Sequence, residues 1–141
     1  MKESTAPCHE CVLVVDDDED ARESLREAVE MIGCSVVTAA SGAEALNLLE
    51  NRRPCLMVLD LMMPGMSGAQ VMEAMRRRPA LDAMCVVIAT SAPDFAPKGV
   101  PVIPKPIDLD TIWAWVRRNC QCDGVADASP GPAAPSSRPL R

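Results

Sequence analysis

The chain is poor in residues and patterns that mark several classes of protein. Its 141 residues include no tyrosine, one phenylalanine and one histidine, His9. No apolar run approaches the roughly 18 residues of a membrane span, and the N-terminal segment holds no apolar stretch like that of an export signal. We therefore expect a cytoplasmic protein without a membrane partner.

An excess of positive charge is missing as well. The chain carries 14 lysines and arginines against 20 aspartates and glutamates, which gives a formal net charge of -6. A general attraction to the phosphate backbone of nucleic acids is therefore not expected. The 7 cysteines are an odd number in a chain without an evident export signal, which favours thiols over a disulfide framework.

Short apolar runs alternate with segments in which apolar residues recur at steps of three and four. The runs are nearly free of polar residues, as is typical of strands that helices cover on both faces, and the periodic segments indicate amphipathic helices. This alternation predicts an α/β fold, a doubly wound parallel sheet of five strands. The predicted strands are 11–15, 34–39, 55–60, 85–90 and 100–103.

Local signals predict where the helices begin and end. Gly33 is expected to stop the first helix, and Ser41, Ser67 and Asp108 are expected to cap later ones. On the last helix, Trp113 is expected to face inward and Trp115 to lie on the flank. We assign residues 11–122 to one domain, residues 1–10 to a flexible N-terminal segment, and residues 123–141, rich in Pro, Ser and Ala, to a disordered tail without a second domain.

Acidic residues stand where two of these strands end. Asp16 and Asp17 close the first strand and Asp60 closes the third, and in the usual order 2-1-3-4-5 these strands are neighbours. Active groups gather outside the carboxyl ends of strands in such sheets. Three close carboxylates raise one another's pKa unless a cation compensates, and carboxylate oxygens suit a hard ion such as Mg²⁺. We interpret the acids as a metal site, whereas the following Asp18, Glu19 and Asp20 suit a helix N-terminus.

The next two strands add a hydroxyl and an ammonium to the same edge. The fourth strand ends in Thr90, and Lys105 follows the fifth. A carboxylate, a divalent ion, a hydroxyl and an ammonium together favour phosphoryl transfer onto an aspartate.

Four motifs in this order resemble the receiver domains of bacterial response regulators. "VLVVDDDED" resembles the first strand and acidic pair of that family, and "VLDLMMPGMSG" its phosphoacceptor strand and following loop. "VVIAT" resembles the hydroxyl-bearing strand, and "IPKPID" the lysine-proline turn. The resemblance covers roughly residues 11–120 and implies a flavodoxin-like fold. It also implies Mg²⁺-dependent transfer of phosphate from a kinase phosphohistidine to an aspartate.

The resemblance also implies individual roles. Asp60 would be the phosphoacceptor, Thr90 would bind a phosphoryl oxygen and shift inward on phosphorylation, and Lys105 would pair with the phosphate. The Mg²⁺ ligands would be Asp16, Asp17, Asp60 and the backbone carbonyl of Met62, while Pro64 and Gly68 would shape the loop after the third strand.

We therefore interpret the chain as a single-domain receiver of a two-component phosphorelay. Its expected partners are a histidine kinase or phosphotransfer protein and a downstream protein reached by contact. It would not be a turnover enzyme, because it would catalyse only its own phosphorylation and slow dephosphorylation. Its single histidine, His9, lies outside the predicted fold, which argues against a role as kinase or phosphohistidine carrier.

Two features depart from the family pattern. The segment 91–104 contains prolines at 93, 97, 101 and 104, and an interior proline costs a helix about 3 kcal/mol. The fourth helix is therefore predicted to be missing or reduced to a turn. Val102 stands where the family usually has an aromatic residue, so an alternative function is a receiver-like interaction module that works without phosphorylation.

Three other hypotheses start from the same residues. An EF-hand is rejected because Ala21 stands where that calcium loop needs glycine. A haloacid dehalogenase type of phosphatase is disfavoured because "DLMMP" has no second aspartate two residues after Asp60. A zinc or redox site opposite the acids is a further hypothesis, which packing of the cysteines as small core hydrophobes outweighs. It would involve His9, Cys8, the cysteines at the amino ends of the strands (Cys11, Cys34, Cys55 and Cys85), and Cys120 and Cys122 at the end of the last helix.

Overall fold

A parallel sheet of five strands forms the centre of the computed structural model, which describes residues 12–82 and 84–120. The strand order is β2-β1-β3-β4-β5, as predicted, and every neighbouring pair is parallel. The strands are β1 (Val12–Val15), β2 (Val36–Ala39), β3 (Leu56–Asp60), β4 (Cys85–Thr90) and β5 (Val102–Pro104). The predicted N-terminal segment 1–10 and tail 123–141 lie outside the described residues.

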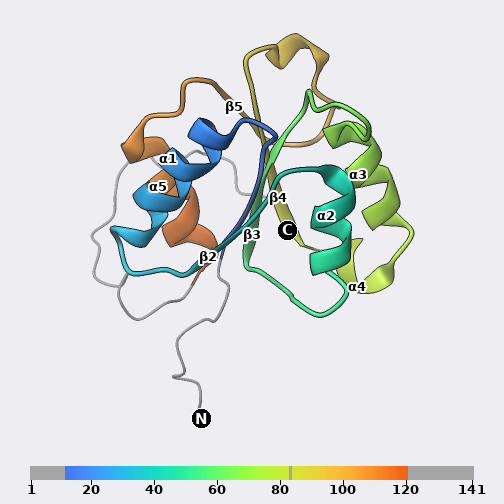
Figure 1. The fold of residues 1–141 in the computed structure, drawn as a ribbon, viewed down its shortest axis with the longest axis horizontal. Coiled ribbons are helices and arrows are strands. Elements are labelled where there is room, and N and C mark those ends of the chain that lie inside the picture. The colour runs from blue at the N-terminus through green and yellow to red at the C-terminus, as the bar shows by residue number, and fades with distance from the viewer. Residues whose placement is uncertain (1–11, 83, 121–141) are drawn as a thin grey trace.

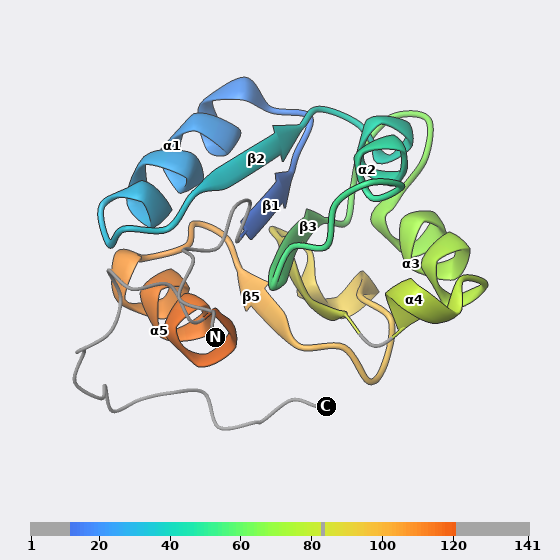
Figure 2. The same ribbon diagram turned by 90° about the horizontal axis from the view of Figure 1, so that it is seen from below.

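Helices cover both faces of the sheet, which confirms the doubly wound, flavodoxin-like architecture. The helices are α1 (Glu19–Glu30), α2 (Gly42–Leu48), α3 (Gly68–Arg76), the short α4 (Pro79–Asp82) and α5 (Leu109–Asn119). Helices α1 and α5 lie on one side of the sheet and α2 and α3 on the other (Figures 1 and 2).

The alternation of side chains along each strand explains why both faces need a cover. Val12 and Val14 of β1 belong to the core beneath α1 and α5, whereas Leu13 and Val15 belong to the core beneath α2 and α3. Successive side chains of a strand point to opposite faces, so strands that are apolar at every position form two cores. All four residues of β1 are buried.

The predicted helix signals act as caps. The Ser41 hydroxyl accepts a hydrogen bond from the Glu44 N–H, Ser67 and Gln70 form a reciprocal capping box, and the Asp108 carboxylate accepts from the Thr111 N–H. Gly33 has a φ of 93° and follows the last turn of α1, a conformation that glycine adopts readily. These caps fix where each helix leaves the sheet edge.

The connection between β4 and β5 contains no α-helix, as predicted. A single turn of 3-10 helix, η1 (Pro93–Phe95), stands there instead. The exposed fraction of Phe95 on this turn is 70%. The surface beside β5 therefore differs in shape from one built on a regular helix.

The expectation for the two tryptophans was wrong. Trp115 is buried with Ile112 and Val116, while Trp113 is only partly buried and its indole N–H donates to the Ala28 carbonyl at 2.7 Å. Residues 112, 115 and 116 stand three and four apart, which is the spacing of one helix face. Trp113 reaches α1 from the flank through its polar edge.

Within residues 12–82 and 84–120, no helix has both the length and the apolar character needed to cross a bilayer.

The loop after β3 packs closely at Gly68. A Cβ built on this residue would lie 2.5 Å from the carbonyl oxygen of Asp60 and 2.9 Å from the Cα of Leu61. The Gly68 N–H also donates to the Leu61 carbonyl at 3.0 Å. The start of α3 therefore lies directly against the backbone that carries Asp60.

We expect Gly68→Ala to destabilise the fold because backbone atoms cannot move aside as easily as side chains. The expected loss of unfolding free energy is about 2 to 3 kcal/mol, typical of an overpacked core, and urea denaturation measures it. Gly65→Ala is the matched control: its Cβ meets no atom within 4 Å, but its φ of 81° is strained for alanine and costs about 1 kcal/mol. A loss for Gly68→Ala no larger than that of the control would contradict the packing argument.

Candidate functional site

Three carboxylates converge at the carboxyl edge of the sheet. Asp60 is the last residue of β3, and Asp16 and Asp17 directly follow β1, whose Val15 pairs with Leu59 of β3. One oxygen from each of the three carboxylates lies within 4.8 Å of the others. Asp16 and Asp60 are buried and Asp17 is exposed, so the cluster opens to solvent on the side of Asp17.

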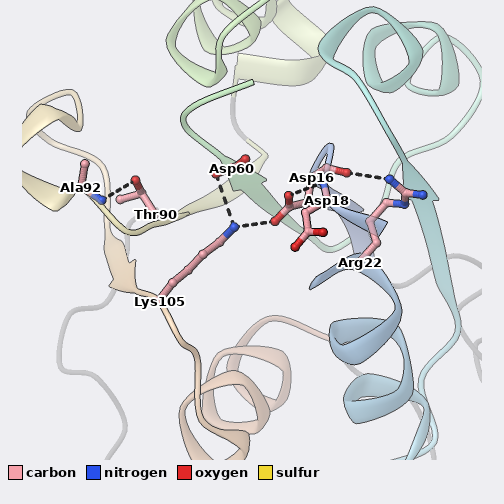
Figure 3. A network of polar contacts seen from close by, with 7 residues as sticks. All are labelled: Asp16, Asp18, Arg22, Asp60, Thr90, Ala92 and Lys105. Atoms are coloured by element: carbon pink, nitrogen blue, oxygen red, sulfur yellow. Dashed lines mark hydrogen bonds and ion pairs between the residues drawn. The ribbon is translucent and has the colours of Figure 1, made fainter. Parts of the chain in front are cut away.

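The ammonium group of Lys105 lies between the two buried acids (Figure 3). Its Nζ is 2.6 Å from Oδ2 of Asp16 and 3.5 Å from Oδ1 of Asp60. Lys105 directly follows β5, and its backbone N–H donates to the Thr90 carbonyl at 2.9 Å. The side chains of Asp16, Asp60 and Lys105 thus come from three different strand ends.

Backbone hydrogen bonds hold Asp16 in place. Its Oδ1 accepts from the Asp18 N–H at 2.9 Å, and its backbone carbonyl accepts from Nη1 of Arg22 at 2.9 Å (Figure 3). Sequence reasoning missed Arg22, because no periodicity or motif marks a guanidinium that binds a main-chain carbonyl six residues earlier. Arg22 and the Asp18 N–H together fix the turn from β1 into α1.

Thr90 ends β4 and is fully buried. Its Oγ1 accepts a hydrogen bond from the Ala92 N–H at 2.9 Å (Figure 3). Since the hydroxyl acts here as acceptor, its own O–H remains able to donate. The Thr90 side chain thus stands at the end of the strand next to β3.

The pKa of Asp60 is raised from 3.8 to about 6. Burial is the largest cause, and the negative charge of Asp16 adds to it. The Lys105 ammonium and a hydrogen bond from the Met62 N–H act in the opposite direction but do not cancel the shift. Asp60 is therefore a carboxylate that lacks sufficient positive charge around it.

The pKa of Lys105 is also raised, which for an amine favours the charged form. Burial alone would favour its neutral form, but the hydrogen bond and charge of Asp16, followed by the charge of Asp60, raise its pKa. Lys105 is thus held as an ammonium, a donor able to bind oxygen anions. One ammonium stands against three carboxylates.

The carboxylate cluster fits a hard divalent cation. Its donors are oxygens close enough to share one ion, and Mg²⁺ binds through carboxylates while keeping part of its water shell. The open side at Asp17 leaves room for such water. Met62, the remaining predicted ligand, has a side chain that is 56% exposed and a backbone N–H that contacts Asp60.

Comparisons with known proteins match the chain to one family. Residues 12–117 match the sequence profile of the response regulator receiver domain. The response regulator MprA of Mycobacterium sp. (strain KMS) is 35% identical over 113 residues, which are 75% of this chain and 48% of that protein. The chain therefore spans about half the length of the curated relatives it matches.

Two solved structures show the same architecture. The chemotaxis protein CheY4 of Vibrio cholerae has a TM-score of 0.70 at 25% identity, over 79% of this chain and 99% of that one. The response regulator protein TrrA of Thermotoga maritima, in complex with Mg(2+)-BeF, has a TM-score of 0.69 at 26% identity, over 78% and 98% of the two chains.

We expect Asp60→Asn to stabilise the fold when divalent ions are removed. Because the folded-state pKa of Asp60 lies above 3.8, ionisation penalises the folded state progressively from pH 3.8 to about 6, and the full penalty remains above that range. Removing the charge should raise the unfolding free energy by roughly 1 to 3 kcal/mol at neutral pH and by little below pH 4. Thermal denaturation with a chelator at the two pH values measures the difference.

The matched control is Asp94→Asn, an exposed aspartate on η1 outside the cluster. It should change the melting temperature little at either pH. Equal stabilisation by both variants, or a gain for Asp60→Asn that does not depend on pH, would contradict the assignment of charge crowding to Asp60.

Proposed function

The chain belongs to the family of response regulator receiver domains, and from that premise we propose that Asp60 accepts a phosphoryl group from a phosphohistidine. The donor would be a histidine kinase or a phosphotransfer protein in the cytoplasm. The observation that carries this proposal is the position of the Lys105 ammonium between Asp16 and Asp60, beside the three-carboxylate cluster.

In the proposed reaction a carboxylate oxygen of Asp60 attacks the phosphorus in line with the phosphorus–nitrogen bond of the donor. A phosphorus–oxygen bond forms while that bond breaks, and the imidazole leaves. Lys105 needs to move little to bind a phosphoryl oxygen, since its Nζ already lies 3.5 Å from Oδ1 of Asp60. The Thr90 O–H can donate to another phosphoryl oxygen once the side chain turns toward Asp60.

Magnesium is the cofactor that the residues support. We propose that Asp16, Asp17 and Asp60 hold it together with the backbone carbonyl of Met62. When bound, the ion supplies positive charge that offsets the carboxylates and the incoming phosphoryl oxygens. The complex of TrrA with Mg(2+)-BeF supports the same chemistry by analogy.

The phosphorylated chain would signal by protein contact, and the chain itself would turn over no substrate other than its own phosphoryl group. We propose this role for the receiver domain that these residues form; the curated relatives are about twice as long as this chain. Its acidic net charge of -6 gives no support to binding of nucleic acid by these residues.

A second candidate function is an interaction module that does not require phosphorylation. The observation that favours it is the replacement of a helix between β4 and β5 by η1, with Phe95 70% exposed. A partner could bind this surface whether or not Asp60 carries phosphate. The two candidates differ in whether Asp60 accepts phosphate at all.

We expect the natural chain to gain the mass of one phosphoryl group when incubated with acetyl phosphate and Mg²⁺. The gain should disappear in Asp60→Asn and with EDTA, and persist in the control Asp94→Asn. Intact-mass spectrometry measures the change. If neither acetyl phosphate nor a phosphorylated histidine kinase labels the natural chain, the phosphoacceptor proposal is wrong and the second candidate gains support.

The phosphorylated form should be long-lived, because two residues that flank the site, Met62 and Ala92, have no side chain suited to orienting an attacking water. Met62, two residues after Asp60, and Ala92, two after Thr90, cannot form hydrogen bonds to water through their side chains, apart from a weak thioether acceptor. We expect Met62→Asn to shorten the half-life of the phosphoryl group by about three- to tenfold, below the range of full general acid–base catalysis.

The decay of phosphorylated protein after removal of the donor measures this half-life. Met31→Asn is the matched control, because Met31 is also exposed but lies at the C-terminal end of α1. An unchanged half-life in Met62→Asn, or equal shortening in both variants, would exclude this role for the residue.

A further inference from the structure

Four cysteines lie at the amino edge of the sheet, opposite the acidic cluster. Cys34 stands two residues before β2, Cys55 directly precedes β3, Cys85 begins β4, and Cys120 directly follows α5. All four are thiols rather than disulfides. Cys34 and Cys120 are each only 3% exposed and belong to the core beneath α1 and α5, and Cys55 and Cys85 pack against that core.

Cys120 is the thiol that connects this group. Its side chain is in hydrogen-bonding contact with both Cys34 and Cys55. The contact follows from the fold: α1 and α5 lie side by side on the same face of the sheet (Figures 1 and 2), Cys34 follows the turn after α1, and Cys120 ends α5. The chain thus brings together two sulfur atoms from positions far apart in the sequence.

The two thiols of the Cys34–Cys120 pair differ in acidity. The hydrogen bond from Cys120 lowers the pKa of Cys34, although burial opposes this effect. Hydrogen bonding to Cys34, then to Cys55, and burial raise the pKa of Cys120. Cys34 therefore carries the sulfur that ionises more readily, and the thiolate is the form that oxidants attack.

The described thiols are less suited to binding a metal ion than to forming a disulfide. Within residues 12–82 and 84–120, the group of potential ligand atoms that all lie within 4.8 Å of one another consists of Asp16, Asp17 and Asp60. Three or more thiols in tetrahedral zinc sites must approach at least that closely. Cys8, His9, Cys11 and Cys122, which the zinc hypothesis also involved, lie outside the described residues.

We propose that Cys34 and Cys120 form a reversible disulfide and make the amino edge of the sheet a redox-sensitive modification site. The bond would tie the end of α5 to the turn that follows α1. It lies at the edge of the sheet opposite Asp60 and does not depend on the proposed phosphorylation.

Hydrogen peroxide is the class of oxidant that suits so buried a pair, because a molecule little larger than water can reach thiols that are only 3% exposed. The Cys34 sulfur, as thiolate, attacks hydrogen peroxide, so that a sulfur–oxygen bond forms and the oxygen–oxygen bond breaks. The departing hydroxide takes up the proton that the Cys34 thiol has lost, which gives a sulfenic acid and one water. The Cys120 sulfur then displaces the sulfenic oxygen, which leaves with the proton of Cys120 as a second water. Overall, two thiols and one peroxide give one disulfide and two waters.

The test treats the full natural chain with hydrogen peroxide, blocks the remaining thiols by alkylation, and maps cross-linked peptides under non-reducing conditions. We expect the monomer to lose the mass of two hydrogens, a cross-link between Cys34 and Cys120, and full reversal by dithiothreitol. Cys34→Ala and Cys120→Ala should each abolish this cross-link. Circular dichroism checks that the variants fold, and the mapping of the natural chain stands even if one does not.

Two matched controls sharpen the assignment. Cys122 shares a tryptic peptide with Cys120, so Cys122→Ala should leave the cross-link intact and excludes misassignment within that peptide. Cys85→Ala tests another thiol of the same edge and should also leave it intact. A chain that keeps all its thiols, cross-links only between molecules, or pairs Cys34 or Cys120 with a different cysteine would overturn the proposal.

Discussion

The repulsion among the carboxylates of Asp16, Asp17 and Asp60 is the constraint on which the site depends. The parallel register of β1 and β3 forces these groups together, and two of them are buried. Close carboxylates of this kind persist only when the rest of the fold holds them in place. The hydrogen bonds of Arg22 and the Asp18 N–H to Asp16, and the packing of Gly68 on the Asp60 backbone, provide that support.

The same crowding explains the chemistry that the site suits. Lys105 offsets part of the negative charge, yet the pKa of Asp60 remains at about 6, which leaves a demand for further positive charge. A divalent ion would meet this demand with the oxygen donors available. In the proposed reaction, a phosphoryl group would bring anionic oxygens for Lys105 and Thr90 to bind. The loss of stability expected without metal and the reactivity proposed with it therefore follow from the same crowding of carboxylates.

The strands and the residues at their ends could be predicted from the sequence because apolar runs and strand ends are local signals. The strand order was taken as the usual one for such sheets, and it brought Asp16, Asp60, Thr90 and Lys105 to one edge. The missing helix between β4 and β5 was also predictable from a local signal, its prolines. The burial of Trp115 was not foreseen, although its spacing of three residues from Ile112 allowed it, because Trp113 was expected to face inward instead. Two hydrogen bonds depend on tertiary geometry, which no residue pattern encodes: that of the Trp113 indole N–H to the Ala28 carbonyl, and that of Arg22 to the Asp16 carbonyl.

Helix α5 relates the two edges of the sheet to each other. It begins shortly after Lys105, with its cap at Asp108, and ends at Cys120, so that its 11 residues span about 16 Å between the acidic cluster and the thiol pair. Because Ile112, Trp115 and Val116 bury one face of α5 against the sheet, the helix can shift only as a unit. A covalent bond at Cys120 would therefore restrict the same helix whose other end adjoins Lys105 of the proposed phosphoacceptor site. It would leave the acidic cluster itself open to solvent at Asp17.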